Sequence, residues 1–217
     1  MQPFTSHRGI IATLDRANVD TDQIIPKQFL KSIKRTGYGE QLFFDWRYLP
    51  DGKSDPSFEL NQPKFKDASI LVTRNNFGCG SSREHAVWAL TQYGLKAIIA
   101  PRMGNIPAFA DIFHNNSMKN GLLNVELKES EVDEIFQMVG RYEGLEATIN
   151  LEEKRITLHV PDVEEISFHF EIDKAVKEHL IRGLDEIGLS LQHEKDITRF
   201  EKAHDPQKYW PSSSPSS

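Results

Sequence analysis

The chain has 217 residues, of which 38% are hydrophobic and 27% charged, and its net charge at pH 7 is -6. This composition excludes extensive intrinsic disorder, and a chain of this length buries roughly 70% of its unfolded surface without a disulfide or metal. The acidic balance argues against sequence-independent binding of nucleic acid, which depends on Lys and Arg. No apolar run reaches the roughly 18 residues that span a bilayer, and the first residues lack the apolar segment of a signal peptide. We therefore expect a cytoplasmic protein without membrane contact.

The N-terminal part of the sequence predicts two apolar segments and then a long irregular stretch. Arg8–Leu14 is apolar and β-branched, as is typical of a strand, and the polar residues 15–22 predict a turn after it. Ile24 and Ile25 form a short apolar unit that Pro26 ends. Residues 26–55 are irregular and contain the aromatic residues Tyr38, Phe43, Phe44, Trp46 and Tyr48. Such a loop is a functional or partner-binding segment, or an aromatic mini-core that covers one end of the domain, and the two interpretations are compatible.

From residue 69 onward, strand patterns alternate with helix patterns. Three apolar runs predict strands: Ser69–Thr73, Ala97–Ala100 closed by Pro101, and Gly121–Val125. Four segments predict helices: Ser81–Tyr93 ended by Gly94, Pro107–Asn116, Glu129–Val139, and Lys174–Asp185 ended by Gly188. Three alternating stretches predict short paired strands: Ala147–Leu151, Arg155–Val160 and Phe168–Ile172. This order predicts an α/β protein that is not a clean series of βαβ units.

The most informative stretch is Asn75–Ala86 (NNFGCGSSREHA), a glycine-rich turn between a predicted strand and a predicted helix. Two glycines allow the backbone to turn tightly and to approach a ligand, and a helix start favours an anion. Ser81 and Glu84 have the spacing of a capping box, so spacing alone favours Ser81 as a simple helix cap. The hydroxyl of Ser82 and the guanidinium of Arg83 exceed what a cap requires, and together they suit a carboxylate ligand.

Other functions for this stretch fit its spacing less well. His85 lies four residues after Ser81 on the same predicted helix, whereas the base of a serine hydrolase normally comes from a separate segment, and no G-x-S-x-G pattern is present. No Gly-Lys-Ser/Thr of a Walker loop follows the glycines. Cys79, the only cysteine, lies near a helix start that would lower its pKa and make it a nucleophile. A cysteine beside glycines is more often small and buried.

Three segments resemble the small, swivelling domain of the aconitase superfamily. Residues 76–86 (NFGCGSSREHA) closely resemble its signature, and residues 18–26 (NVDTDQIIP) are similar to its other hallmark. Residues 109–113 with Asn116 and residues 119–121 also resemble the family, and the matches run in the expected order from Arg8 to about Val125. The length and the long loop most resemble the small subunits of bacterial 3-isopropylmalate dehydratases.

The resemblance implies a three-layer β/β/α swivelling domain over residues 1–204, with a long loop at about 27–56. The Ser/Pro composition of residues 205–217 predicts a disordered tail. One departure from many relatives is Ser117, which stands where they carry cysteine, and we expect it to be neutral.

The resemblance also implies a hydro-lyase subunit that is active only with a large subunit. In this family the large subunit holds a [4Fe–4S] cluster through three cysteines, and the open iron acts as a Lewis acid on the substrate. Because an all-cysteine cluster site takes about four thiolates, this chain with its lone Cys79 is expected to bind no cluster or metal itself. The implied reaction, in leucine biosynthesis, converts 2-isopropylmalate to 3-isopropylmalate through isopropylmaleate. The alternative substrates are methylmalate or citraconate, and homocitrate.

Functional residues carry over from the family onto matching positions. Ser81 becomes the base that removes a proton beside a carboxylate, Arg83 binds a carboxylate, and Ser82 is a substrate-binding or supporting hydroxyl. Asp22 lies near the substrate and orients Arg83 or a histidine of the partner. For Asp20 and Asp22, an Asx turn is the alternative.

The loop after Pro26 contacts the variable group of the substrate in relatives. Leu30 is the candidate for an isopropyl branch, whose burial contributes about 1–3 kcal/mol. Lys31, Ser32 and Arg35 are candidates for the distal carboxylate, although a solvated basic loop explains each of them equally well. Two rival functions remain as alternatives. One is an RNA-binding module, which the net charge of -6 disfavours. The other is a free-standing hydrolase built on Ser81 and His85.

Overall fold

The computed structural model describes residues 2–31, 36–81, 83–161 and 165–183. The chain divides into a compact unit, Met1–Gly183, and a second unit, Leu184–Ser217, which lies outside the described residues. The predicted domain boundary at residue 204, the tail at 205–217 and the predicted helix end near Gly188 therefore all lie outside the description as well.

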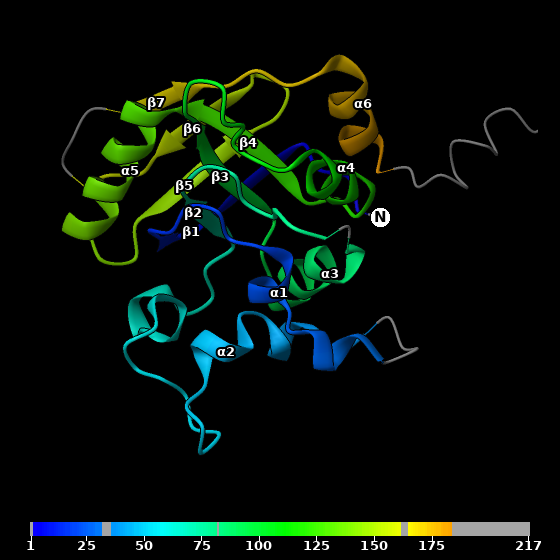
Figure 1. The fold of residues 1–217 in the computed structure, drawn as a ribbon. Helices are drawn as coiled ribbons and strands as arrows, with labels where there is room; N and C mark the ends of the chain where they lie inside the picture. The colour runs from blue at the N-terminus through cyan, green and yellow to red at the C-terminus, as the bar shows by residue number, and fades with distance from the viewer. Residues whose placement is uncertain (1, 32–35, 82, 162–164, 184–217) are drawn as a thin grey trace, which may run out of the picture. The chain divides into compact units, whose positions relative to one another are not determined.

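Within the described residues, seven strands form one sheet in which the first strand joins a parallel half to an antiparallel half (Figure 1). The order across the sheet is β4-β3-β2-β1-β5-β6-β7. Strand β1 pairs in parallel with β2, where Ile11 faces Ile70, and antiparallel with β5, where Ser6 faces Asn150. The strands are β1 (Ser6–Leu14), β2 (Ile70–Thr73), β3 (Ala97–Arg102), β4 (Leu123–Lys128), β5 (Glu146–Asn150), β6 (Arg155–Leu158) and β7 (Ile166–His169).

Helices connect the strands of the parallel half, which confirms the α/β class. Helices α3, α4 and α5 follow β2, β3 and β4 in turn, and α6 follows β7 (Figure 1). Their bounds are α3 (Glu84–Tyr93), α4 (Asp111–Lys119), α5 (Glu129–Arg141) and α6 (Lys174–Arg182). Two short helices, α1 (Thr21–Ile24) and α2 (Phe44–Arg47), lie between β1 and β2, with 3-10 turns at Lys27–Lys31, Gly39–Gln41, Glu59–Asn61 and Pro63–Phe65.

Several predicted element bounds were wrong, and tertiary pairing explains the clearest cases. Strand β3 continues through Pro101 to Arg102, because beyond Ile99 it pairs only with β4 and the missing N–H of proline interrupts no bond to β2. Helix α4 begins at Asp111 instead of Pro107, because the intervening residues are extended against the glycine-rich loop. There, Asn76 N–H donates to Pro107 O at 2.9 Å and Phe77 N–H donates to Ala108 O at 3.0 Å.

Three further bounds differ from the prediction. Strand β4 runs on to Lys128, β7 covers Ile166–His169 instead of Phe168–Ile172, and α6 ends at Arg182. Gly183 follows α6 with a φ of 62°, the left-handed conformation that ends many helices. The segment at Thr21–Ile24, predicted as a turn and an apolar unit, is a short helix instead.

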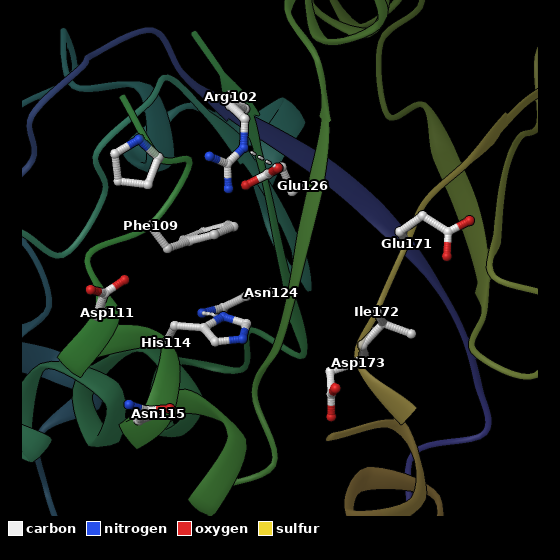
Figure 2. Close-up of a pocket in the computed structure, with 11 residues that line it drawn as sticks. Arg102, Phe109, Asp111, His114, Asn115, Asn124, Glu126, Glu171, Ile172 and Asp173 are labelled. Carbon is white, nitrogen blue, oxygen red and sulfur yellow. Dashed lines mark hydrogen bonds and ion pairs between the residues drawn. The ribbon is translucent and has the colours of Figure 1, made fainter. Parts of the chain in front are cut away.

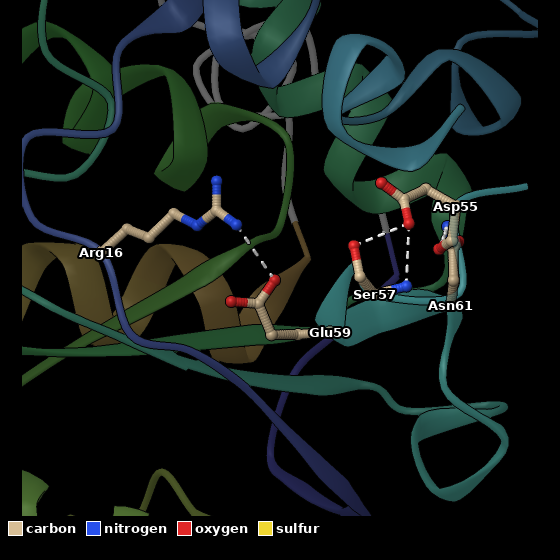
Figure 3. Close-up of polar contacts among 5 residues, drawn as sticks. All are labelled: Arg16, Asp55, Ser57, Glu59 and Asn61. Carbon is tan, nitrogen blue, oxygen red and sulfur yellow. Dashed lines mark hydrogen bonds and ion pairs between the residues drawn. The ribbon is translucent and has the colours of Figure 1, made fainter. Parts of the chain in front are cut away.

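The aromatic segment between α1 and β2 forms the mini-core that the sequence left as one of two alternatives. Tyr38 and Phe43 are fully buried, and Phe43 stacks on Trp46 with ring centroids 5.6 Å apart. The guanidinium of Arg16 lies 4.2 Å from the Trp46 ring centroid and pairs with Glu59 at 3.3 Å (Figure 3). Figure 3 also shows Asp55 accepting two hydrogen bonds from Ser57, which fixes the turn that precedes the 3-10 turn at Glu59–Asn61.

Because strands β1 to β4 are parallel, their carboxyl ends meet at one edge of the sheet. The segment after β1 and the segment after β2 leave from this edge, and they carry the Asp-Thr-Asp and Gly-Cys-Gly-Ser sequences respectively. Ligands of open α/β sheets bind outside the carboxyl ends of parallel strands, so the fold places both motifs where a site is expected.

Candidate active site

Backbone hydrogen bonds join the two motif-bearing loops. Thr21 N–H donates to Cys79 O at 2.9 Å, and Gly78 N–H donates to Val19 O at 2.8 Å. Asp20 and Cys79 form an isolated parallel β-bridge. Two segments that are far apart in the sequence therefore form one backbone unit, which positions the side chains that follow.

The two glycines of the second loop, Gly78 and Gly80, are required for different physical reasons. Gly78 has a φ of 75°, and a Cβ at this position would lie 2.2 Å from Cγ of Phe113. The loop therefore presses directly onto α4, which only a residue without a side chain permits. Gly80 has a φ of 91° with its nearest neighbour 3.5 Å from a Cβ, so backbone conformation, and not crowding, favours glycine there.

Ser81 is exposed at the end of this loop and does not cap the helix. Helix α3 begins at Glu84, with Arg83 as its N-cap and no side-chain cap hydrogen bond. The predicted capping box between Ser81 and Glu84 was therefore wrong. The carboxylate of Glu84 instead accepts a hydrogen bond from Asn120 Nδ2 at 3.0 Å. The hydroxyl of Ser81 lies 3.4 Å from Thr21 Oγ1, and the carbonyl of Ser81 accepts from the same Thr21 hydroxyl at 3.0 Å.

A group of three charged side chains from both loops includes Arg83, which follows this serine by two residues. Arg83 Nη1 forms an ion pair with Asp22 Oδ1, and Lys27 Nζ lies 3.3 Å from Asp22 Oδ2. The Arg83 side chain is only 17% exposed, whereas Asp22 is 40% and Lys27 72% exposed. One carboxylate thus contacts two cations, and the trio carries a net positive charge that favours an anionic ligand.

Asp20 and Asp22 have different roles, although they are two residues apart. Asp20 is the N-cap of α1, where its carboxylate accepts from Gln23 N–H at 2.8 Å and Gln23 Oε1 accepts from Asp20 N–H at 2.8 Å. Asp20 is therefore a structural cap, in line with a local turn role for that residue. Asp22 pairs with Arg83, which is one of the two partners that the resemblance implied for it.

The competing roles of Cys79 and His85 find no support in the geometry. Burial, with the neighbouring Asp20 carboxylate, raises the pKa of the Cys79 thiol, which is the opposite of what a nucleophile requires. The ring of His85 lies 5.3 Å from that of Tyr38 and 4.8 Å from that of Trp88, so it packs within an aromatic cluster. Ser81 and His85 therefore do not form the hydrogen-bonded pair of a hydrolase in the described structure.

The remaining predicted residues are placed only in part. Leu30 is half-buried and packs against the core from the 3-10 turn after Pro26. Lys31 ends that turn, and its side chain lies outside the description, as do Ser32, Arg35 and Ser82. Ser117 is fully buried in α4. Thr21 and Lys27 were missed at the level of sequence; both lie inside or next to the NVDTDQIIP segment, which was the available signal.

A separate cavity of about 530 Å³ lies where α4, β4 and the segment before α6 meet (Figure 2). Its lining includes Arg102, paired with Glu126 at 2.6 Å, and His114, whose pKa burial lowers. None of the predicted site residues lines it. Within the described part of the chain, no group of three or more His, Cys, Asp or Glu side chains is arranged to hold a metal, and no helix is long and apolar enough to cross a membrane.

Comparison with known proteins agrees with this geometry. Residues 1–130 match the aconitase C-terminal domain family, and residues 186–210 match the family of C-terminal domains of the 3-isopropylmalate dehydratase small subunit. The 3-isopropylmalate dehydratase small subunit of Desulforapulum autotrophicum is 59% identical over 93% of this chain and 95% of its own length. The chain belongs to the family of 3-isopropylmalate dehydratase small subunits. The member from Rhodopirellula baltica is 54% identical over 94% of this chain and 99% of its own length. The member from Halalkalibacterium halodurans is 53% identical over 93% of this chain and 98% of its own length.

The fold of this small-subunit family is also found in a crystal structure. The 3-isopropylmalate dehydratase (leuD) of Methanocaldococcus jannaschii superposes with a TM-score of 0.62 at 24% identity, covering 90% of this chain and 99% of that one. The resemblance inferred from the sequence motifs and the aconitase-type α/β fold are therefore confirmed.

Proposed function

We propose that this chain is the small subunit of a 3-isopropylmalate dehydratase, a hydro-lyase that interconverts 2-isopropylmalate and 3-isopropylmalate through isopropylmaleate in leucine biosynthesis. The observation that carries the proposal is the exposed Ser81, two residues before Arg83, whose guanidinium pairs with Asp22 beside Lys27, in a chain 53–59% identical to small subunits of that name.

The proposal includes a large subunit as the partner and a [4Fe–4S] cluster held by that partner. This chain has one cysteine, with a raised pKa and partly buried, so its own residues do not fit a cluster. When bound, the cluster would supply a Lewis acid for the departing hydroxyl. We place the complex in the cytoplasm, where a free thiol such as Cys79 persists.

Ser81 is the proposed base. In the dehydration direction its Oγ takes the proton from the carbon beside a carboxylate, the C–H electron pair forms the C=C bond, and the hydroxyl leaves as hydroxide with the electron pair of the C–O bond. A serine oxygen accepts that proton efficiently only as an alkoxide, so its negative charge requires strong stabilisation. The guanidinium of Arg83 two residues away and the uncapped start of α3 supply positive potential on this part of the loop.

Arg83 and Lys27 are the proposed partners of the substrate carboxylates. Asp22 neutralises one of these two charges and holds the buried guanidinium, which leaves one net cation for a dianionic substrate. Arg is suited to this role because its planar fork binds a carboxylate through two N–H groups. Ser82, Leu30, Lys31, Ser32 and Arg35 remain the further substrate-binding candidates, with Leu30 the apolar one for the isopropyl branch.

The test is reconstitution of this chain with a cluster-bearing large subunit under anaerobic conditions, followed by assay of Ser81→Ala. Because a general base contributes about 10²- to 10⁴-fold, we expect turnover to fall by at least about 10²-fold with assembly intact. Ser117→Ala is the control, since Ser117 is a serine of α4 outside the two loop sequences and is buried, and it should keep normal turnover. A loss of about tenfold or less in Ser81→Ala would reduce Ser81 to a structural residue.

The same complex decides the substrate. Preferred turnover of 2-isopropylmalate supports the proposal, whereas preferred turnover of methylmalate, citraconate or homocitrate establishes the alternative small subunit. Leu30→Ala should shift preference toward a smaller branch by about 10- to 200-fold if Leu30 contacts the isopropyl group.

A further inference from the structure

Thr21 is a buried polar residue whose side chain is directed at the proposed base. It is only 2% exposed, and its hydroxyl is one of few polar side chains in the core. Among the described residues, both hydrogen-bond partners of this hydroxyl belong to Ser81, the carbonyl oxygen at 3.0 Å and Oγ at 3.4 Å. Packing alone does not explain why a buried hydroxyl forms its hydrogen bonds with a single exposed serine.

Main-chain hydrogen bonds join the two loops in addition to the bond from this hydroxyl to the Ser81 carbonyl. The backbone of Thr21 donates to Cys79 O at 2.9 Å, Gly78 donates to Val19 O at 2.8 Å, and the bridge between Asp20 and Cys79 adds to them. These bonds use main-chain atoms that remain in any variant with a normal backbone. The Thr21 side chain is therefore not the only link between the loops and can have a second role.

A hydroxyl has one proton and two acceptor sites, which defines that role. At rest the Thr21 proton is donated to the Ser81 carbonyl, so the Ser81 hydroxyl donates to Thr21 Oγ1 and its orientation is fixed. When Ser81 Oγ carries negative charge, rotation of one bond turns the Thr21 proton onto it.

We infer that Thr21 is a positioning residue that orients the Ser81 hydroxyl and donates a hydrogen bond to its charged form. The inference rests on the proposed function of Ser81 and adds a residue that acts only through it. A hydrogen bond to a charged group contributes about 1.5–3 kcal/mol, equivalent to roughly 10- to 150-fold in rate.

The experiment compares three variants in the reconstituted two-subunit enzyme. Thr21→Val removes the hydroxyl at constant shape, and Thr21→Ser keeps the hydroxyl and removes the methyl group. Thr73→Val is the matched control, because Thr73 is also fully buried at a strand end and donates across the fold to a backbone carbonyl, that of Arg16 at 3.2 Å, without contacting Ser81.

We expect Thr21→Val to lower kcat by roughly 10- to 150-fold with KM within about twofold, because the lost bond strengthens only as Ser81 becomes charged. Thr21→Ser should restore kcat to within about threefold, and Thr73→Val should leave it unchanged. Equal losses in Thr21→Val and Thr21→Ser, or in Thr21→Val and Thr73→Val, would show a packing effect and overturn the inference. So would normal kcat in Thr21→Val. If Thr21→Val does not assemble with the large subunit, Thr21→Ala replaces it with the same outcomes.

The double variant separates this inference from the proposal beneath it. If Thr21 acts through Ser81, adding Thr21→Val to Ser81→Ala causes no further loss of the residual turnover. A further loss equal to that of the single variant would overturn the role of Thr21 while leaving Ser81 in place. Full turnover in Ser81→Ala alone would instead overturn the proposed function.

Discussion

At the residue scale, Asp22 forms ion pairs with a cation from each of the two motif-bearing loops. Its carboxylate pairs with Arg83 on one oxygen and Lys27 on the other, and each partner comes from a different loop. The ion pair with Lys27 is exposed and contributes little stability, whereas Arg83 is largely shielded from water. Loss of the Asp22 charge therefore affects the orientation of Arg83 most.

Asp22→Asn should lower turnover by at least about tenfold without preventing assembly, because an amide holds a guanidinium less firmly than a carboxylate does. The measurement is kcat/KM of the reconstituted complex, with co-purification as the check on assembly. Asp20→Asn is the control two residues away; asparagine caps helices as well as aspartate, so it should behave normally. Normal turnover in Asp22→Asn would remove Asp22 from the site.

Cys79 offers a second test at this scale. Burial and the Asp20 carboxylate raise the pKa of its thiol above the usual 9.0, and Sγ lies 3.4 Å from the carbonyl of Asn18. The thiolate fraction at pH 7 is therefore small, and alkylation by iodoacetamide should be slow at pH 7 and accelerate steadily above pH 9. Cys79→Ala should keep turnover within a few-fold. Fast alkylation at neutral pH that abolishes activity would restore the nucleophile hypothesis.

At the element scale, the contact between the glycine loop and α4 sets the geometry of the site. Gly78 packs against the Phe113 ring so closely that a methyl group has no space, and Phe113 in turn lies 5.4 Å from Phe77 between ring centroids. The loop is therefore fixed by backbone pairing on one side and by an aromatic ring on the other.

Gly78→Ala should destabilise the fold by about 1–3 kcal/mol or more, because it combines a left-handed φ with a clash against a core ring. Gly140→Ala is the opposite case, since Gly140 is an exposed position within α5 with nothing within 4 Å of a Cβ. It should stabilise the protein by about 0.5–1 kcal/mol. Urea unfolding of both variants measures the two effects, and equal midpoints would contradict the contact described above.

The sequence predicted the elements well where local pattern decides them. The β-branched runs at Ile70–Thr73 and Ala97–Ala100 and the amphipathic segment from Glu129 are found close to where they were expected. The sequence-based prediction failed where a contact with a distant part of the chain decides the local structure. Residues 107–110 have a helical pattern, but their backbone pairs with Asn76 and Phe77. The motifs indicated both loops of the candidate site, yet the contact between Thr21 and Ser81 spans 60 residues and has no local signal.

At the scale of the whole molecule, two half-buried histidines couple stability to pH. Burial lowers the pKa of His7 on β1, with Lys96 adding to the effect, and burial also lowers the pKa of His114 on α4. Both rings therefore favour the neutral form in the folded state, while the unfolded chain takes up protons near pH 6.5.

It follows that these two histidines cost no stability well above pH 6.5, and that their effect lowers the free energy of unfolding as pH falls from 6.5 toward the lower folded-state values. Urea titrations at intervals between pH 7.5 and 5 should show this decrease. The double variant His7→Gln, His114→Gln should show a flatter dependence over the same range. A wild-type stability that is constant or rises on acidification would contradict the burial of these rings.

The place of β1 at the centre of the sheet has a consequence for biosynthesis. This strand is made first, but its antiparallel partner β5 begins only at Glu146. At typical translation rates the ribosome needs on the order of ten seconds to make the residues in between. During that time an apolar segment with unsatisfied backbone groups emerges without its neighbour, so the nascent chain offers a natural target to chaperones until the second half of the sheet arrives.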